Sequence, residues 1–142
     1  MARPLLGAVV AVGIVLVSAL PAQAANLGYA IFRGHYINKG DYLTRTVDPT
    51  VGTGYSVQLI MQPDGNLVLK RTTGKVCWAA GTNPSGHHAV YQQDGNFVVV
   101  NSSGRALWAS NTVGSISATG STVAVENTGS FFVGKKLIFY RC

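Results

Sequence analysis

A short row of polar side chains occurs twice in the chain. The row places an amide, a carboxylate and a second amide at alternate positions, first at Gln62, Asp64 and Asn66 and then at Gln92, Asp94 and Asn96. Alternate side chains of a β-strand share one face, so each row would form a polar strip. Neighbouring sugar hydroxyls need such a mixture, because each hydroxyl both gives and takes a hydrogen bond. Val68 and Val98 continue the rows and would contact the carbon face of a sugar ring.

The same residues also fit a hairpin turn. Asp64-Gly65 and Asp94-Gly95 are Asp-Gly pairs, which favour tight turns between strands. A turn requires only this central pair, whereas both copies keep the flanking Gln and Asn as well. The residues by themselves leave a simple turn and a sugar-binding strip open.

Both rows belong to a longer internal repeat. The segment Met61–Leu69 matches Tyr91–Val99 after a displacement of 30 residues, and in each copy a tryptophan follows the second amide by 12 positions. A third, eroded copy lies at Val125–Val133, displaced by a further 34 residues, with Phe139 or Tyr140 expected in the tryptophan's place. The repeat predicts three similar structural units.

Each unit alternates polar and apolar residues and contains a glycine-centred turn, the pattern of antiparallel strands with one buried face. Met61, Leu67 and Leu69 would point into the core. Trp78 and Trp108 are interpreted as core aromatics where the units meet, because so small a unit cannot bury its own apolar face. A stacking platform for sugar is the alternative. We expect an all-β fold of three sheets around one core, with an exposed loop over 44–55.

The first 24 residues have the layout of a secretory signal: an early Arg3, an apolar run from Leu5 to Leu20, and a small-residue cleavage site ending at Ala24. An uncleaved anchor is the alternative, but the run is short of the roughly 20 residues that a span needs. Removing 24 of the 142 residues leaves 118, enough for one domain over 25–142. We therefore predict a secreted, extracellular protein without stable membrane insertion.

Charge and metal-ligand patterns exclude several classes. Beyond Arg3 the chain has 10 basic and 5 acidic residues, and the basic residues are spread out rather than clustered as on a nucleic-acid face. A solvated surface is the simple interpretation, and an anionic cell envelope is a second one. His87 and His88 are adjacent rather than spaced for chelation, so we expect no metal and no cofactor.

Cys77 and Cys142 are the two cysteines of the chain. In an oxidising compartment two thiols are most simply interpreted as one disulfide, which would hold the C-terminus. Closing a loop of 65 residues should stabilise the fold by roughly 3 to 4 kcal/mol. Two free or intermolecular thiols remain the alternative.

The repeated rows resemble the signature of the bulb-type mannose-binding lectins, Gln-x-Asp-x-Asn-x-Val-x-Tyr, through its first four fixed positions. The run FRGHYINKGDYL at 32–43 is similar to that family's entry strands, and the segment 108–112 to its strand ending. The resemblance covers nearly all of residues 27–140. It implies a β-prism of three four-stranded antiparallel sheets with pseudo-threefold symmetry, each sheet with one potential mannose pocket.

The resemblance also implies roles for the side chains in each row. Asp64 and Asn66 would contact the axial 2-hydroxyl of mannose, Gln62 the 3-hydroxyl, and Val68 the carbon face. The second row, Gln92, Asp94, Asn96 and Val98, would act in the same way. Family members often dimerise by exchanging C-terminal strands, so a homodimer is one assembly that this implies. A Cys77–Cys142 bond would block that exchange, or fix it covalently between chains.

The sequence departs from the signature at its closing tyrosine, which in the family engages the 4-hydroxyl. Lys70 stands there in the first copy and Val100 in the second. Val100 cannot hydrogen-bond through its side chain, so binding should weaken by about 0.5 to 1.5 kcal/mol. Lys70 could donate to a hydroxyl or favour an acidic sugar, or simply be solvated. The third copy has lost the polar row, and no pocket is expected there: Glu126, Thr128, Ser130, Phe132, Gly134.

Two rival functions remain from the sequence. A lectin fold can serve as an interaction or antagonism protein, of the lectin-like bacteriocin type, in which sugar binding is vestigial. An enzyme is the third class, and a glycosidase would need two carboxylates about 5 to 10 Å apart. Asp64 and Asp94 occupy equivalent places in different repeats, so they should lie on different sheets. We predict a sugar-binding protein and not an enzyme.

Overall fold

The computed structural model describes residues 7, 10–15, 23–51, 54–114 and 121–142. Most of the predicted signal, 1–24, lies outside the described residues, and its cleavage stays a prediction. Among the residues described, no helix is long and apolar enough to cross a membrane.

Regular structure in the described part of the chain consists of twelve short β-strands. In chain order these are β1 Ala30–Phe32, β2 Tyr36–Asn38, β3 Tyr42–Thr46, β4 Ser56–Met61, β5 Leu67–Arg71, β6 Val76–Ala79, β7 His88–Tyr91, β8 Phe97–Val100, β9 Ala106–Ala109, β10 Thr122–Val125, β11 Phe131–Val133 and β12 Lys136–Phe139.

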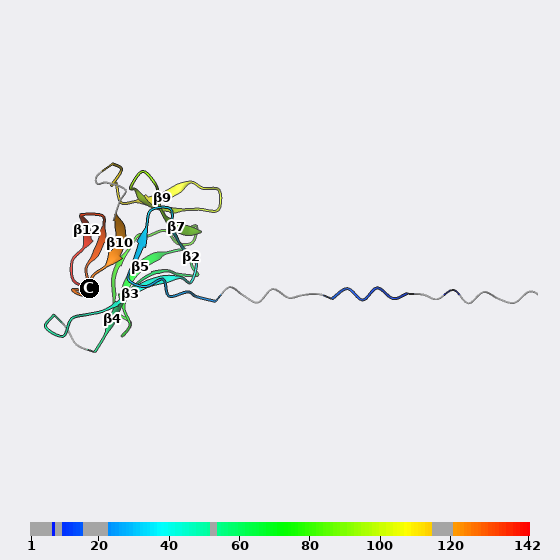
Figure 1. The fold of residues 1–142 in the computed structure, drawn as a ribbon, viewed down its shortest axis with the longest axis horizontal. Coiled ribbons are helices and arrows are strands. Elements are labelled where there is room, and N and C mark those ends of the chain that lie inside the picture. The colour runs from blue at the N-terminus through cyan, green and yellow to red at the C-terminus, as the bar shows by residue number, and fades with distance from the viewer. Residues whose placement is uncertain (1–6, 8–9, 16–22, 52–53, 115–120) are drawn as a thin grey trace, which may run out of the picture.

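The strands form three four-stranded antiparallel sheets around a common centre (Figure 1). Their orders are β3-β4-β5-β6, β2-β7-β8-β9 and β1-β10-β11-β12, called here the first, second and third sheet. Each sheet combines three consecutive strands from one repeat with one of the N-terminal strands β1, β2 and β3. The predicted prism of three four-stranded sheets is confirmed.

Strict alternation of side chains explains why these strands share one core. In β4, Val57, Leu59 and Met61 are fully buried, whereas the residues between them are partly exposed. Leu67 and Leu69 of β5 are also fully buried, as the sequence predicts. One face of every sheet therefore points to the centre of the prism, and the opposite face points outward.

Aromatic rings meet at the centre of the prism. The ring centroids of Trp78 and Trp108 are 5.2 Å apart, and Trp78 is 5.3 Å from Phe131. These edge-to-face contacts confirm that the tryptophans are core aromatics. In the third sheet the aromatic that reaches Trp78 is Phe131 of β11, and Phe139 of β12, one of the two residues expected in the tryptophan's place, packs partly buried against the same core. Tyr140 is instead 60% exposed.

The expected loop over 44–55 begins later than the sequence suggests. β3 continues to Thr46, paired residue by residue with β4, and Val47 is buried beyond it. The Thr and Val residues of this stretch fit a pleated strand as well as a loop, so composition alone misplaces the boundary.

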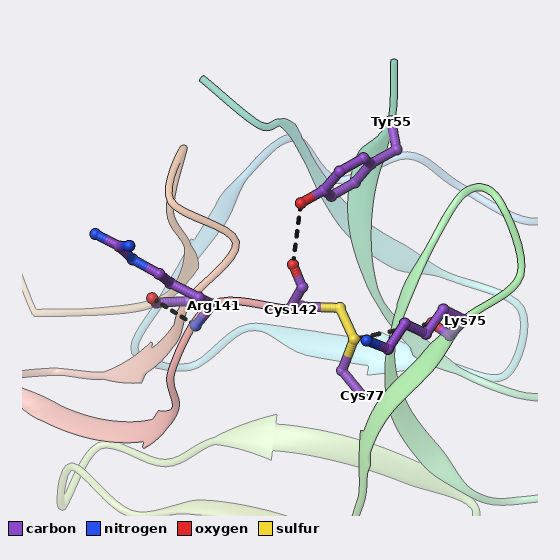
Figure 2. Close-up of a disulfide and its surroundings, with 6 residues drawn as sticks. Tyr55, Lys75, Cys77, Arg141 and Cys142 are labelled. Carbon is purple, nitrogen blue, oxygen red and sulfur yellow. Dashed lines mark hydrogen bonds between the residues drawn. A yellow bond between two sulfur atoms is a disulfide. The ribbon is translucent and has the colours of Figure 1, made fainter. Parts of the chain in front are cut away.

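A disulfide between Cys77 and Cys142 joins β6 of the first sheet to the chain's last residue, beyond β12 of the third sheet (Figure 2). Their Cα atoms are 5.4 Å apart, within the usual range for a disulfide. The hydroxyl of Tyr55 donates to the Cys142 carbonyl at 3.3 Å. The predicted Cys77–Cys142 disulfide is confirmed.

Candidate functional site

The two polar rows lie in hairpin turns rather than along strands. In the β4–β5 turn, the Gln62 amide donates to the Asn66 carbonyl, and the Gly65 amide donates to the Gln62 carbonyl, each at 2.9 Å. The β7–β8 turn at 92–96 repeats both bonds. The expectation of a strand face is wrong for these residues, because the Asp-Gly pair reverses the chain. Only the last positions of each row lie on strands, at Val68 and Lys70 of β5 and at Val98 and Val100 of β8.

The aspartate and asparagine side chains stabilise their own turns. Oδ1 of Asp64 accepts from the backbone amide of Asn66 at 2.9 Å. Oδ1 of Asn66 accepts from the amides of Gly81 and Thr82, at 3.0 and 3.1 Å. Asp64 closes a local Asx turn in this way. Asn66 fastens the loop that follows β6 to the turn.

The second turn has the same side-chain bonds with small changes. Oδ1 of Asp94 accepts from the Asn96 amide at 2.9 Å, and Oδ1 of Asn96 accepts from the Thr112 amide at 3.3 Å. Gln92 lies beside this carboxylate. In the orientation that satisfies both groups, its amide nitrogen donates to Oδ1 and Oδ2 of Asp94, at 3.2 and 3.3 Å. The structure thus brings Gln92 and Asp94 together at one side of the turn.

The bonds that hold each turn use Oδ1 of its Asp and Oδ1 of its Asn. In the first turn, Oδ2 of Asp64 and the Nδ2 amide of Asn66 take no part in them. Asp64 is exposed, and Gln62 and Asn66 are partly exposed. An acceptor and a donor therefore face the outside of a rigid turn, which is suited to one hydroxyl that gives and takes a hydrogen bond.

Two buried threonines, Thr82 and Thr112, hydrogen-bond to the backbone of the two turns. The sequence does not single them out. The Thr82 hydroxyl donates to the Gly65 carbonyl at 2.8 Å and accepts from the Leu67 amide at 3.3 Å. The Thr112 hydroxyl donates to the Gly95 carbonyl at 2.6 Å. Both threonines are buried. The one signal for them is that each follows the row's asparagine by 16 positions.

A glycine is required at the centre of each turn. Gly65 has φ of 89°, and a Cβ there would lie 2.7 Å from the carbonyl oxygen of Gly86. Gly95 has φ of 90°, and a Cβ there would lie 2.8 Å from the guanidinium of Arg33. The repeated glycine thus meets a demand for positive φ and for close packing against a neighbouring loop.

The valines of the rows offer little surface to a ligand. Val68 and Val98 are each 3% exposed on the outward side of their strands, because neighbours across the sheet cover them. Lys70 is partly exposed and pairs in register with Gln58. Val100, at the second closing position, pairs in register with His88. Burial of the His88 ring, together with the nearby His87, lowers the His88 pKa below its usual value.

The third sheet keeps the turn without the polar row. The Glu126 amide donates to the Ser130 carbonyl, and the Gly129 amide to the Glu126 carbonyl, at 2.8 and 2.9 Å. The Cys142 amide donates to the Gly129 carbonyl, where the first turn uses Thr82. Because this turn forms with Glu126, Thr128 and Ser130 at the three positions of the row, the fold does not require Gln, Asp and Asn there. In the described residues, no three metal-binding side chains gather.

Three sheets arranged in this way, two of them with a polar motif turn, define a β-prism lectin. Comparison with protein-family models and with curated sequences gives no match. Solved structures do match. One is a lectin from garlic (Allium sativum), at 30% identity over 78% of this chain and 97% of that chain, with a TM-score of 0.59.

Two further structures are similar. The mannose-specific agglutinin of snowdrop (Galanthus nivalis) bulbs, solved with methyl-α-D-mannoside, is 28% identical over 74% of this chain and 87% of that chain, with a TM-score of 0.59. A monomeric monocot mannose-binding lectin from Gastrodia elata is 25% identical over 80% and 96%, also with a TM-score of 0.59. The chain belongs to the bulb-type, snowdrop-agglutinin-like lectin family. Lectins are not enzymes, in agreement with the sequence prediction.

Proposed function

We propose that the protein is a secreted lectin that binds mannose or mannose-containing glycans at the two motif turns. The first site comprises Gln62, Asp64, Asn66, Val68 and Lys70. The second comprises Gln92, Asp94, Asn96 and Val98. The observation that carries this proposal is that both turns are held through Oδ1 of the Asp and Oδ1 of the Asn, so the turn itself requires neither Oδ2 of the Asp nor Nδ2 of the Asn.

Comparison of the three turns supports a ligand role for the row. All three make the same two backbone bonds, so the backbone geometry alone accounts for neither the glutamine nor the aspartate. The second turn also pairs Gln92 with Asp94, an arrangement that orients both groups toward one side. In the related snowdrop structure the ligand is methyl-α-D-mannoside, which identifies mannosides as the class to test.

Affinity at each single site should be weak. Lys70 and Val100 replace the closing tyrosine, and one neutral hydrogen bond accounts for about 0.5 to 1.5 kcal/mol, or up to roughly tenfold in affinity. Glycans with several terminal mannoses would bind more tightly through two sites on one molecule, if their spacing allows both to be occupied.

The C-terminus favours a chain that keeps its own last strand. β12 pairs with β11 of its own sheet, and the following residue, Cys142, is joined to Cys77 of the same chain. Exchange of this strand with a second chain would require the disulfide to break. We therefore propose that the protein does not dimerise by strand exchange. Light scattering, which measures the molecular mass in solution, tests this. The disulfide fits the oxidising environment that a secreted protein meets.

Calorimetric titration of residues 25–142 with methyl-α-mannoside and a branched mannose oligomer tests the function. Two double variants serve as matched pairs: Gln62→Ala with Asp64→Asn for the first site, and Gln92→Ala with Asp94→Asn for the second. Asparagine keeps the Oδ1 acceptor of the Asx turn, so the fold should survive. We expect each double variant to lose binding at its own site and to keep binding at the other. No heat from the wild type at millimolar ligand would refute the proposal and favour the antagonism protein.

A further inference from the structure

The outward face of the second sheet carries aromatic and imidazole groups beside the motif turn. Alternation places Tyr36 and Asn38 of β2 outward, because Ile37 between them is fully buried. His88 and Val90 of β7 also point outward, since Ala89 and Tyr91 are fully buried. The same face carries Val98 and Val100 of β8. Side chains from three adjacent strands thus share one surface with the second site.

The register aligns these residues in two rows across the sheet. One row runs from Tyr36 through Val90 to Val98. The next row runs from Asn38 through His88 to Val100. Directly opposed side chains in antiparallel strands have Cβ atoms about 5 Å apart. His88 is therefore the direct neighbour of the position where the signature's closing tyrosine is missing.

The two rings form a fixed pair. The centroid of Tyr36 lies 5.2 Å from that of His88, with an interplanar angle of 63°. On its other side, Nδ1 of His88 is hydrogen-bonded to Nδ1 of His87 at 2.9 Å. A ring held by two neighbours loses little further freedom when a ligand binds, which favours affinity. Tyr36 is nevertheless 52% exposed, so one side of its ring is open to solvent.

The segment before β2 lies directly against the motif turn. Nη1 of Arg33 donates to the Gln93 carbonyl at 2.8 Å, and a Cβ on Gly34 would lie 2.8 Å from the Gln93 amide nitrogen. The Tyr91 amide donates to the His35 carbonyl at 3.0 Å. Tyr36 therefore lies at the border of the second site. The contacts of the three residues before it fix its place relative to the motif turn.

We propose that His88 and Tyr36 extend the second site into one for two linked mannose units, with His88 hydrogen-bonding a sugar hydroxyl and Tyr36 stacking on the second ring. Tyr36 and Val98 stand two strand spacings apart, about 10 Å. One sugar ring does not bridge that distance, but two linked rings do. An imidazole both donates and accepts, so it can replace the lost phenol.

The first sheet provides the natural comparison. Tyr42 and Gln58 occupy the places of Tyr36 and His88, since Tyr42 pairs with Ile60, and Gln58 with Lys70. The chain before β1 runs along the edge of β3, where the Leu27 amide donates to the Tyr42 carbonyl at 3.0 Å. Tyr42 is partly buried as a result. The extension therefore belongs to the second sheet.

This inference rests on the proposed function. It is tested in the double variant Gln62→Ala with Asp64→Asn, in which the first site has been removed. Methyl-α-mannoside and an α-linked mannobiose are titrated by calorimetry. We expect mannobiose to bind about threefold to tenfold more tightly, the range of one aromatic contact. Tyr36→Ala should remove that preference, so that the two ligands bind with equal affinity. Tyr36→Phe should retain the preference. Tyr29→Ala changes a similarly exposed tyrosine away from the site and should have no effect.

His88→Phe keeps a ring beside Tyr36 but loses the hydrogen bond, so both ligands should bind about twofold to tenfold more weakly. As a second measurement, mannobiose should shift the backbone amide resonances of residues 36–38 and 88–90 in the wild type, and methyl-mannoside should leave those of 36–38 unchanged. An unaltered preference in Tyr36→Ala would overturn the extension while the lectin function stands. Failure of the wild type to bind any mannoside would overturn both.

Discussion

Thr82 and Thr112 are equivalent by sequence, yet the structure predicts that replacing each with valine costs different amounts of stability. Valine is β-branched like threonine and has a methyl group in place of the hydroxyl. At Thr112 this leaves the Gly95 carbonyl without its 2.6 Å donor. It also removes the 2.7 Å bond to the Ser110 hydroxyl, which can still donate to Asn96 Oδ1 at 3.2 Å. The neighbouring Phe97 amide keeps its own partner, because it donates to the Ser110 hydroxyl at 2.9 Å.

In the first turn, Thr82 alone is the partner of both backbone groups that Thr112 and Ser110 share in the second turn. Its hydroxyl accepts from the Leu67 amide and donates to the Gly65 carbonyl, so Thr82→Val leaves two backbone groups unpaired. The position equivalent to Ser110 is Ala80, whose side chain cannot substitute. One buried unsatisfied group costs about 1 to 3 kcal/mol. We therefore expect Thr112→Val to cost about 1 to 3 kcal/mol, and Thr82→Val about twice as much.

Chemical denaturation monitored by tryptophan fluorescence measures both costs, because Trp78 and Trp108 lie in the core. The disulfide stays intact in both variants, so the slope of the free energy against denaturant should not change. Equal costs, or a larger cost for Thr112→Val, would refute the difference in hydrogen bonding. Wild-type stability in both variants would show that the hydroxyls do not support the turns.

Three further results are expected. Replacing both Cys77 and Cys142 with serine should lower the free energy of unfolding by about 4 kcal/mol, because the unfolded chain is no longer constrained by a 65-residue loop. Chemical denaturation of the wild type and this double variant measures the difference. Phe131→Ala should cost about 3 to 5 kcal/mol, seen as a lower melting temperature, because its ring is fully buried against Trp78. The His88 pKa is lowered in the folded state, so the unfolded chain binds more protons; stability should fall as pH drops below about 6.5, and His88→Phe should reduce this loss in denaturation series across pH.

The sequence predicts the fold through its repeat. Two well-preserved copies and one eroded copy predict three sheets, and the alternation around Met61, Leu67 and Leu69 predicts the core face. The error at 62–66 arises because the alternation was extended through an Asp-Gly turn, which reverses the chain. The sequence does not decide between Phe139 and Tyr140 for the third sheet, because the β11–β12 hairpin is so short that Val133 already pairs with Lys136, which changes the register relative to the other two sheets.

The support of the site is not predictable from spacing alone. Thr82 acts on Gly65 across 17 positions, and a contact of that range depends on how the loop after β6 folds back onto the turn. The pairing of His88 with Val100 likewise depends on strand register. A repeat identifies equivalent positions, but it does not state which neighbour each one meets.

The assignment of β1, β2 and β3 to three different sheets has a consequence for folding. These strands are consecutive in sequence, yet β1 pairs with β10, so Ile31 is opposite Val123. Such distant pairings close large loops and slow the folding of β-proteins. During synthesis β3 can pair with β4 soon after both are made, whereas β2 must wait for β7, and β1 stays unpaired until β10, when nearly all of the sequence has been made. We expect a protein that folds late and as one cooperative unit, with refolding in milliseconds to seconds.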